Sequence, residues 1–117
     1  MLEAGKINYI ELPAKDLNQV KRFYNEPFGW TFTDYGPEYT AFSDSGLEGG
    51  FYLADRRNRV SDGSALVVLY SDNLEREKQK IINEGAEISV DIFSFPGGRR
   101  FHFLDPNGNE LAIWSEK

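Results

Sequence analysis

Cysteine is absent from this sequence of 117 residues, and histidine occurs only once, as His102. The absence of cysteine excludes disulfide bonds, thiolate nucleophiles and zinc sites built from cysteine. The sequence has no apolar run of about 18 residues and does not open on a signal peptide, so we expect a cytoplasmic protein with no membrane partner.

Basic side chains are also in the minority, with 13 lysines and arginines against 19 aspartates and glutamates, for a net charge of −6. Nucleic acids and anionic membranes are bound by basic patches, so we expect neither as a partner. The basic cluster Arg56, Arg57 and Arg59 stands beside Asp55 and Asp62, and we interpret it as a solvated loop.

Apolar residues make up 40% of the chain and aromatic residues 15%, which is enough for a hydrophobic core. The length fits one domain, and we assign residues 1–117 to it. Aromatic side chains usually fill a core, but this many can also line a ligand cavity.

The first half of the chain reads as one strand, one helix and three more strands. Asp16 is an expected helix N-cap, and Pro27 and Gly29 are expected to close the helix that follows it. Turn residues separate the later strands. The expected strands are residues 6–13, 30–35, 38–43 and 48–54.

The second half repeats this order after a polar connector at residues 55–63. Asp72 or Asn73 caps a helix over residues 74–84, and Gly85 ends it. The expected strands are residues 64–71, 87–94, 99–104 and 110–115. The repeat predicts an α+β fold of two tandem βαβββ modules, at about residues 6–54 and 64–115.

Two stretches resemble a known family. Residues 9–17 with Phe23-Tyr24 and Phe28-Gly29-Trp30 resemble the opening of a glyoxalase-type module, and residues 101–112, with the turn Asp105-Pro106-Asn107-Gly108-Asn109, resemble its closing hairpin. The chain is therefore identified as a member of the glyoxalase, bleomycin-resistance and extradiol dioxygenase (vicinal oxygen chelate) superfamily. The resemblance implies that each module forms a curved mixed-sheet half-barrel, that two modules create a cavity, and that the protein is a homodimer.

Metalloenzymes of this family hold a divalent ion, and the resemblance places their four ligands at Tyr9, Leu66, Ala112 and a position near Gly50. None of these side chains is a good metal ligand. Because the chain departs from the metalloenzyme pattern at these positions, we expect a protein without a metal or other cofactor. The expected ligand-binding residues are Tyr9, Glu11, Tyr39, Tyr52, Leu66, Tyr70, Phe101, Ala112 and Trp114.

Three residues are candidates for catalysis: Glu11, Glu110 and His102. Either carboxylate could act as an acid or base, anchor a ligand, or lie at the solvated rim. A four-residue turn would pair Phe103 with Glu110 and Phe101 with Ala112, so that these residues face the cavity and His102 faces the helix. A bulge would reverse this assignment.

The aromatic residues also have two interpretations. Tyr9, Tyr39, Tyr52, Tyr70, Trp30 and Trp114 could form a stacking cage for a flat or cationic guest, or they could pack in the core and a dimer interface.

The sequence favours a metal-free protein that binds an apolar or aromatic small molecule in a cavity. The alternative from the enzyme class is a glyoxalase-like lyase or isomerase with a divalent metal at relocated ligands such as Glu11, His102 or Glu110. A dimer with a purely structural role is a third hypothesis, against which the glycine and alanine at cavity positions argue.

Overall fold

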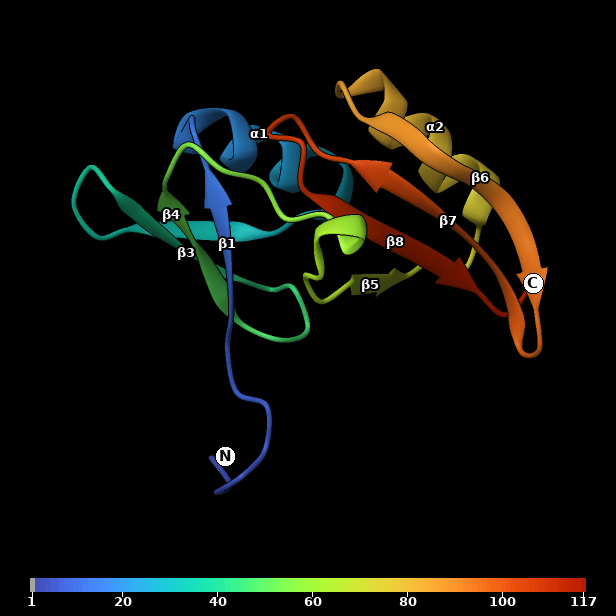
Figure 1. Cartoon of the computed structure of the whole chain (residues 1–117), viewed down its shortest axis with the longest axis horizontal. Coiled ribbons are helices and arrows are strands. Elements are labelled where there is room, and N and C mark those ends of the chain that lie inside the picture. The colour runs from blue at the N-terminus through green and yellow to red at the C-terminus, as the bar shows by residue number, and fades with distance from the viewer. Residues whose placement is uncertain (1) are drawn as a thin grey trace. The chain divides into compact units, whose positions relative to one another are not determined.

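The computed structural model describes residues 2–117, which divide into two compact units between Arg56 and Arg57. This boundary falls within the predicted connector at residues 55–63. In each unit a strand is followed by a helix and three further strands (Figure 1), so the predicted α+β fold of two βαβββ modules is confirmed. Each sheet is open, with two edge strands, and does not close into a barrel.

The first unit contains a four-stranded mixed sheet, here called sheet 1. Its strand order is β1-β4-β3-β2, and β1 and β4 are parallel while the other pairs are antiparallel. The predicted first strand began at residue 6, but β1 begins at Ile10, where its pairing with Gly49 of β4 begins. The elements are β1 (Ile10–Ala14), α1 (Leu17–Phe28), β2 (Thr31–Asp34), β3 (Tyr39–Ser43) and β4 (Gly49–Leu53).

Helix α1 packs on one face of sheet 1. Its predicted N-cap is confirmed, because Asp16 Oδ1 accepts a hydrogen bond from the Gln19 N–H at 3.1 Å. Gly29 ends the helix in the left-handed conformation, with φ of 77°. Pro27 was expected to close the helix but lies inside its last turn. The buried face of α1 presents Val20, Phe23, Tyr24 and Pro27.

Trp30 belongs to this core and not to an exposed stacking cage. Its side chain is buried, and its ring stacks on Tyr24 with a centroid distance of 4.6 Å. Tyr24 also contacts Phe51 of β4, at 5.4 Å between ring centroids. The first unit therefore holds its helix through aromatic packing.

The second unit contains sheet 2, with strand order β5-β8-β7-β6. As in sheet 1, the first and last strands are parallel neighbours and the other pairs are antiparallel. The predicted strand over residues 64–71 is shorter in the structure. The elements are η1 (Val60–Asp62, a 3-10 helix), β5 (Val67–Tyr70), α2 (Leu74–Asn83), β6 (Glu87–Phe95), β7 (Gly98–Leu104) and β8 (Glu110–Ser115).

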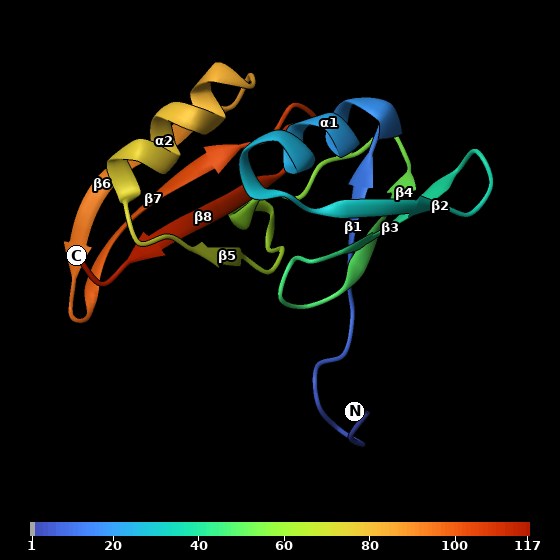
Figure 2. The same cartoon turned by 180° about the vertical axis from the view of Figure 1, so that it is seen from behind.

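Helix α2 covers one face of sheet 2, as the views from the front and from behind both show (Figures 1 and 2). Of the two possible caps, Asn73 caps the helix, accepting from the Arg76 N–H at 3.1 Å. Glu75 of α2 binds both ends of the Arg99 guanidinium on β7, at 2.6 and 3.1 Å. Because Arg99, Phe101 and Phe103 alternate on β7, they share this helix-covered face, where both phenylalanines are fully buried.

The repeat extends to an ion pair between helix and sheet. Lys21 of α1 pairs with Asp34 of β2 at 3.0 Å, and Lys78 of α2 pairs with Asp91 of β6 at 2.8 Å. The aspartate lies 13 residues after the lysine in both cases. Each unit thus fixes its helix on its sheet by the same contact.

The predicted pairing of the last hairpin was wrong by one residue. Leu104 pairs with Glu110, His102 with Ala112 and Phe101 with Ile113. Asp105 N donates to Asn109 O at 2.9 Å, which leaves a three-residue loop with Gly108 in the left-handed conformation, at φ of 91°. His102 and Ala112 consequently share the face opposite α2, and Phe101 lies on the helix-covered face.

The connector is fixed to this hairpin. Asn58 N donates to Asn109 Oδ1 at 2.9 Å, and the Arg59 guanidinium Nε donates to Gly108 O at 2.6 Å. Arg59 was expected in a solvated loop, but it is half-buried by this contact, whereas Arg56 and Arg57 are exposed. No helix within residues 2–117 has the length and apolar character needed to cross a membrane.

We expect Asn109→Ala to destabilise the protein by about 2 kcal/mol or more, because a fully buried amide loses its bonds to Asn58 N and to Asp105 Oδ2. Urea unfolding followed by circular dichroism measures the change. The control Asn83→Ala, on the exposed end of α2, should stay within about 0.5 kcal/mol of the parent. Equal stability of the two variants would contradict the assignment of Asn109 as the link between connector and hairpin.

Candidate functional site

A hydrogen-bonded chain of two tyrosines and a glutamate lies on the face of sheet 1 opposite α1. Tyr39 Oη donates to Glu11 Oε2 at 2.9 Å, and the hydroxyls of Tyr9 and Tyr39 are 2.6 Å apart. A phenol has a single proton, so Tyr39 accepts from Tyr9 while it donates to Glu11. The structure thus brings together three of the predicted ligand-binding residues.

The strand register explains how Tyr39 reaches Glu11. Glu11, Gly50 and Ala41 form one row across β1, β4 and β3, and Tyr39 pairs with Tyr52 in the next row. The Tyr39 ring crosses above Gly50, where any Cβ would collide with the phenol. The glycine therefore provides the space that the ring fills.

The surroundings of Tyr39 favour its protonated form. Burial raises the pKa of the Tyr39 phenol well above its ordinary value, and the hydrogen bonds with Tyr9 and Glu11 raise it further. Glu11 is exposed, as is Tyr9, with 42% of its surface accessible. The free side of the carboxylate can thus accept a hydrogen bond or pair with a cation, next to the tyrosine rings.

A second polar pair, His102 and Glu110, lies on the face of sheet 2 opposite α2. His102 Nδ1 is 2.9 Å from Glu110 Oε2, and the Val60 N–H donates to Glu110 Oε1 at 3.1 Å. Burial by itself would raise the pKa of Glu110, but the hydrogen bonds from His102 and Val60 and the charge of Arg59 outweigh it and hold the pKa below its ordinary value. Glu110 is therefore a carboxylate with both oxygens engaged.

Of the other predicted ligand-binding residues, Tyr52 lies on sheet 1, where it pairs with Tyr39, and the rest belong to the second unit. Ala112 pairs with His102 and Val68, and Trp114 pairs with Tyr70, at 5.2 Å between ring centroids. Leu66 precedes β5 and is half-buried. Phe101 was predicted to face the same way as Ala112, but the corrected register places it on the helix-covered face.

Sequence reasoning missed Arg100 and Phe93 on this face. Arg100 pairs with Trp114 and with Phe93, and its guanidinium carbon lies 5.2 Å from the centre of the Phe93 ring. The alternation of residues 98–104 would have identified Arg100 if the hairpin loop had been taken as three residues long.

The side chains present do not fit the divalent metal site of the family's enzymes. Tyr9 is tied to Tyr39 through its hydroxyl, the space at Gly50 holds the Tyr39 ring, and Ala112 has no donor atom. Across residues 2–117, no three histidine, aspartate or glutamate side chains gather where they could hold a metal ion.

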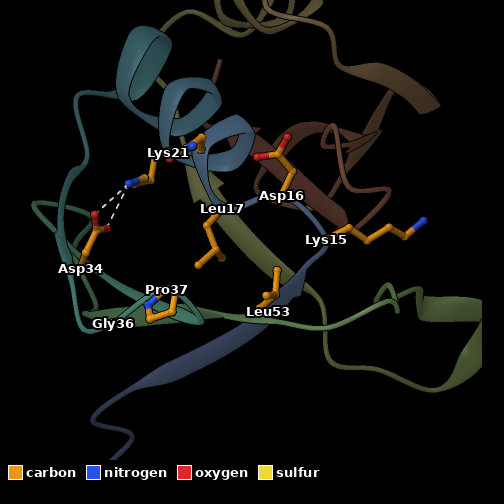
Figure 3. Close-up of a pocket in the computed structure, with 9 residues that line it drawn as sticks. Lys15, Asp16, Leu17, Lys21, Asp34, Gly36, Pro37 and Leu53 are labelled. Carbon is orange, nitrogen blue, oxygen red and sulfur yellow. Dashed lines mark hydrogen bonds and ion pairs between the residues drawn. The ribbon is translucent and has the colours of Figure 1, made fainter.

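A separate cavity in the first unit has a volume of about 420 Å³ and opens near the start of α1 (Figure 3). Leu17, Leu53 and Pro37 point toward one another across it, and the Lys21–Asp34 ion pair closes one side. None of the predicted ligand-binding residues lines this cavity. It lies on the helix side of sheet 1, away from Tyr39.

We expect Gly50→Ala to displace the Tyr39 ring and to lower the pKa of its phenol toward the ordinary value of 10.0. Alkaline titration of tyrosine ring carbons by NMR, assigned with Tyr39→Phe, reports this shift. The raised folded-state pKa also means that the stability from Tyr39 is complete below the ordinary phenol pKa and is lost as the pH rises above it. Thr33→Ala, in the same row, should leave the Tyr39 titration unchanged, and an unchanged titration in Gly50→Ala would disprove the packing argument.

We expect Glu110→Gln to reduce the loss of stability in acid. The pKa of Glu110 is lowered in the folded state, so its contribution is present above the ordinary value of 4.5 and is lost as the pH falls below it. Urea unfolding midpoints measured from neutral pH down to about pH 3 test this. Glu3→Gln, at an exposed position before β1, is the control and should keep the parent's acid dependence.

Comparison with known proteins gives the family. A model of the Glyoxalase/Bleomycin resistance protein/Dioxygenase superfamily matches residues 6–113. A glyoxylase-like domain-containing protein from Didymella fabae is 26% identical over 97% of this chain and 95% of its own length.

Solved structures have the same fold. A genomically encoded fosfomycin resistance protein from Listeria monocytogenes superposes with a TM-score of 0.78 at 18% identity, covering 98% of this chain and 94% of that one. A glyoxalase-related enzyme from Fulvimarina pelagi gives 0.77 at 20% identity, covering 95% and 88%. With the family match spanning nearly the whole chain, the protein belongs to the glyoxalase, bleomycin-resistance and dioxygenase superfamily.

Proposed function

We propose that this protein binds a small planar aromatic molecule that carries an ammonium or N–H group, on the face of sheet 1 formed by Tyr9, Glu11, Tyr39 and Tyr52. The observation that carries the proposal is the Tyr9–Tyr39–Glu11 hydrogen-bonded chain. This group of residues occupies the positions of two of the family's metal ligands, at Tyr9 and above Gly50. It presents phenol rings and a carboxylate there instead of a metal site.

The chemistry of these groups supports an aromatic cation or N–H donor as the ligand. Tyrosine rings attract a cation through their negative faces and stack against flat molecules. Glu11 adds a formal negative charge at the exposed end of the chain, and a charge-assisted hydrogen bond to it is stronger than a neutral one. The net charge of −6 also favours cationic ligands over anionic ones.

The expected affinity is moderate. Apolar area removed from water contributes roughly 25 cal/mol per Å², but the loss of translational and rotational freedom cancels much of this gain. Tyr39 is already held by Glu11 and Tyr9, so its ring loses little further freedom when a ligand stacks on it. Such preorganisation supports dissociation constants in the micromolar range, about −8 kcal/mol.

Relatives with small organic substrates support a ligand of similar size. One of the structural neighbours is a lactoylglutathione lyase from Agrobacterium tumefaciens, with a TM-score of 0.69 at 17% identity. Its name, and that of the fosfomycin resistance protein, refer to small molecules. A similar fold does not imply the same reaction, and this chain lacks good metal-ligating side chains at the positions where the family's metalloenzymes have them.

Calorimetric titration with pairs of aromatic ammonium compounds and their neutral isosteres tests the proposal. Glu11→Gln should weaken binding of the charged member by about tenfold and of the neutral member much less. Tyr39→Phe keeps the ring but removes the hydroxyl that orients Glu11, and should weaken both by about three- to tenfold.

The control is Tyr35→Phe, an exposed tyrosine between β2 and β3, which should bind like the parent. Elemental analysis of the purified protein addresses the alternative enzyme. About one tightly held divalent metal per chain, lost on Glu11→Gln, would overturn the binding proposal in favour of a metal-dependent lyase.

A further inference from the structure

The two helices begin differently on their sheets, although the modules repeat one architecture. Leu17, the first residue of α1, is half-buried and lines the cavity of about 420 Å³. Leu74, the first residue of α2, is only 1% exposed. Because the two modules share their helix cap and their helix-to-sheet ion pair, the contact that closes this junction in the second unit shows what the first unit lacks.

A guanidinium closes the junction in the second unit. Glu75, the second residue of α2, accepts from both ends of the Arg99 guanidinium, at 2.6 and 3.1 Å. The Nε–H of Arg99 also donates to the Lys117 carbonyl at 2.8 Å. A planar group with several N–H donors thus joins the start of the helix to the sheet and to the end of the chain.

The strand pairings identify the residue that stands in place of Arg99 in the first unit. Pro13 and Tyr70 lie at the same distance in sequence before α1 and α2, so the rows that they begin correspond. These rows are Pro13, Tyr52 and Tyr39 in sheet 1, and Tyr70, Trp114 and Arg100 in sheet 2. The residue before Tyr39 is Glu38, and the residue before Arg100 is Arg99. Since Tyr39 lies on the face opposite α1, alternation directs Glu38 to the helix side, where the second unit has its guanidinium.

The partner on the helix differs as well. The second residue of α1 is Asn18, which lines the cavity, whereas α2 has Glu75 at this position. Within residues 2–117, neither the Asn18 amide nor the Glu38 carboxylate makes a hydrogen bond or ion pair. The Glu38 carbonyl accepts from the Leu53 N–H at 2.9 Å, which holds this residue beside a leucine of the cavity. The first unit therefore has two acceptors at this junction and lacks the cation between them.

The other charged groups that line the cavity do not supply this cation. Lys21 is paired with Asp34 at 3.0 Å, and Lys15 is paired with Asp55 at 3.6 Å. Asp16 accepts from the first turn of α1 through Oδ1, and its second oxygen has no partner among the described residues. Between these groups lie the apolar walls of the cavity, formed by Leu17, Pro37 and Leu53 (Figure 3).

We propose that this cavity binds small alkylguanidinium compounds, whose cation takes the place that Arg99 fills in the second unit. The guanidinium donates to the Glu38 carboxylate and to the Asn18 amide oxygen, and its planar fork suits a carboxylate. The alkyl chain lies against Leu17 and Leu53. The site is on the helix side of sheet 1, so it does not depend on the proposed binding of aromatic ligands on the opposite face.

The test compares butylguanidinium with butylurea, which has nearly the same shape but no charge, on the full chain. The probes are titrated into protein labelled at its leucine methyl groups and followed by NMR. The methyl signals of Leu17 and Leu53 should shift to saturation with butylguanidinium, and those of Leu74, at the closed junction of the second unit, should stay in place. Butylurea should bind about tenfold more weakly, because it cannot form a charge-assisted hydrogen bond. Equal affinity of the two probes, or no response of Leu17 and Leu53 at millimolar butylguanidinium, would overturn the proposal.

Single substitutions identify the group that selects the cation. Glu38→Gln should abolish the preference for butylguanidinium over butylurea. Glu84→Gln, the same change at the exposed end of α2, should keep it. Glu11→Gln should also keep it, and this separates the cavity from the proposed site at Tyr39. A preference that survives in Glu38→Gln would contradict the assigned contact.

A double variant transfers the closed junction of the second unit to the first. Asn18→Glu combined with Glu38→Arg places a carboxylate and a guanidinium where Glu75 and Arg99 form their ion pair. The new arginine should occupy the place of the ligand, so butylguanidinium should no longer shift the Leu53 methyl signals. Binding of butylguanidinium to this variant as tightly as to the parent would show that the cation site lies elsewhere, and the proposal would be wrong.

Discussion

The hydrogen bonds made by Asp105 in the β7–β8 turn determine which side chains of the second unit meet. Its carboxylate Oδ1 accepts from the N–H groups of Asn107 and Asn109, both at 2.9 Å, and Gly108 takes the left-handed conformation that the three-residue loop requires. A register slip of one residue would turn every side chain of β8 to the other face. This turn therefore sets three features of the second unit: the contact between His102 and Glu110, the burial of Phe101, and the pairing of Arg100 with Trp114.

A glycine has the corresponding role in the first unit. Gly50 contributes no side chain to the face of sheet 1 that carries Tyr9, Glu11 and Tyr39. Because Gly50 has no Cβ, the Tyr39 ring can cross over β4. The neighbouring Gly49 faces the opposite way, where a Cβ would collide with the Phe42 ring and the Ile10 carbonyl. Two adjacent glycines thus serve the two faces of one strand, the first for core packing and the second for the hydrogen-bonded chain.

The sequence predicted the order of elements well because the determinants of that order are local. The caps Asp16 and Asn73 and the terminating Gly29 act within one helical turn, and apolar spacing marks the buried faces of the helices. The face assignment of His102 failed because the run Asp105–Asn109 permits either a three- or a four-residue loop, and only the pairing of distant backbone groups decides between them. The hydrogen bond from Tyr39 to Glu11 could not be predicted either, because it joins residues that are 28 positions apart in sequence and lie in different rows of the sheet.

The two carboxylates that sequence reasoning selected differ in what they can do. Glu110 has both oxygens engaged, one by the connector and one by an imidazole, so its charge is already paired with groups of the protein. Glu11 is exposed and has one oxygen engaged by a neutral phenol, so its charge remains available to a ligand. The exposed carboxylate of Glu11 can interact with a cation directly, whereas the carboxylate of Glu110 acts on the imidazole that it holds. The same residue type therefore leaves an exposed charge on one sheet, whereas on the other its charge is engaged by the imidazole and the connector.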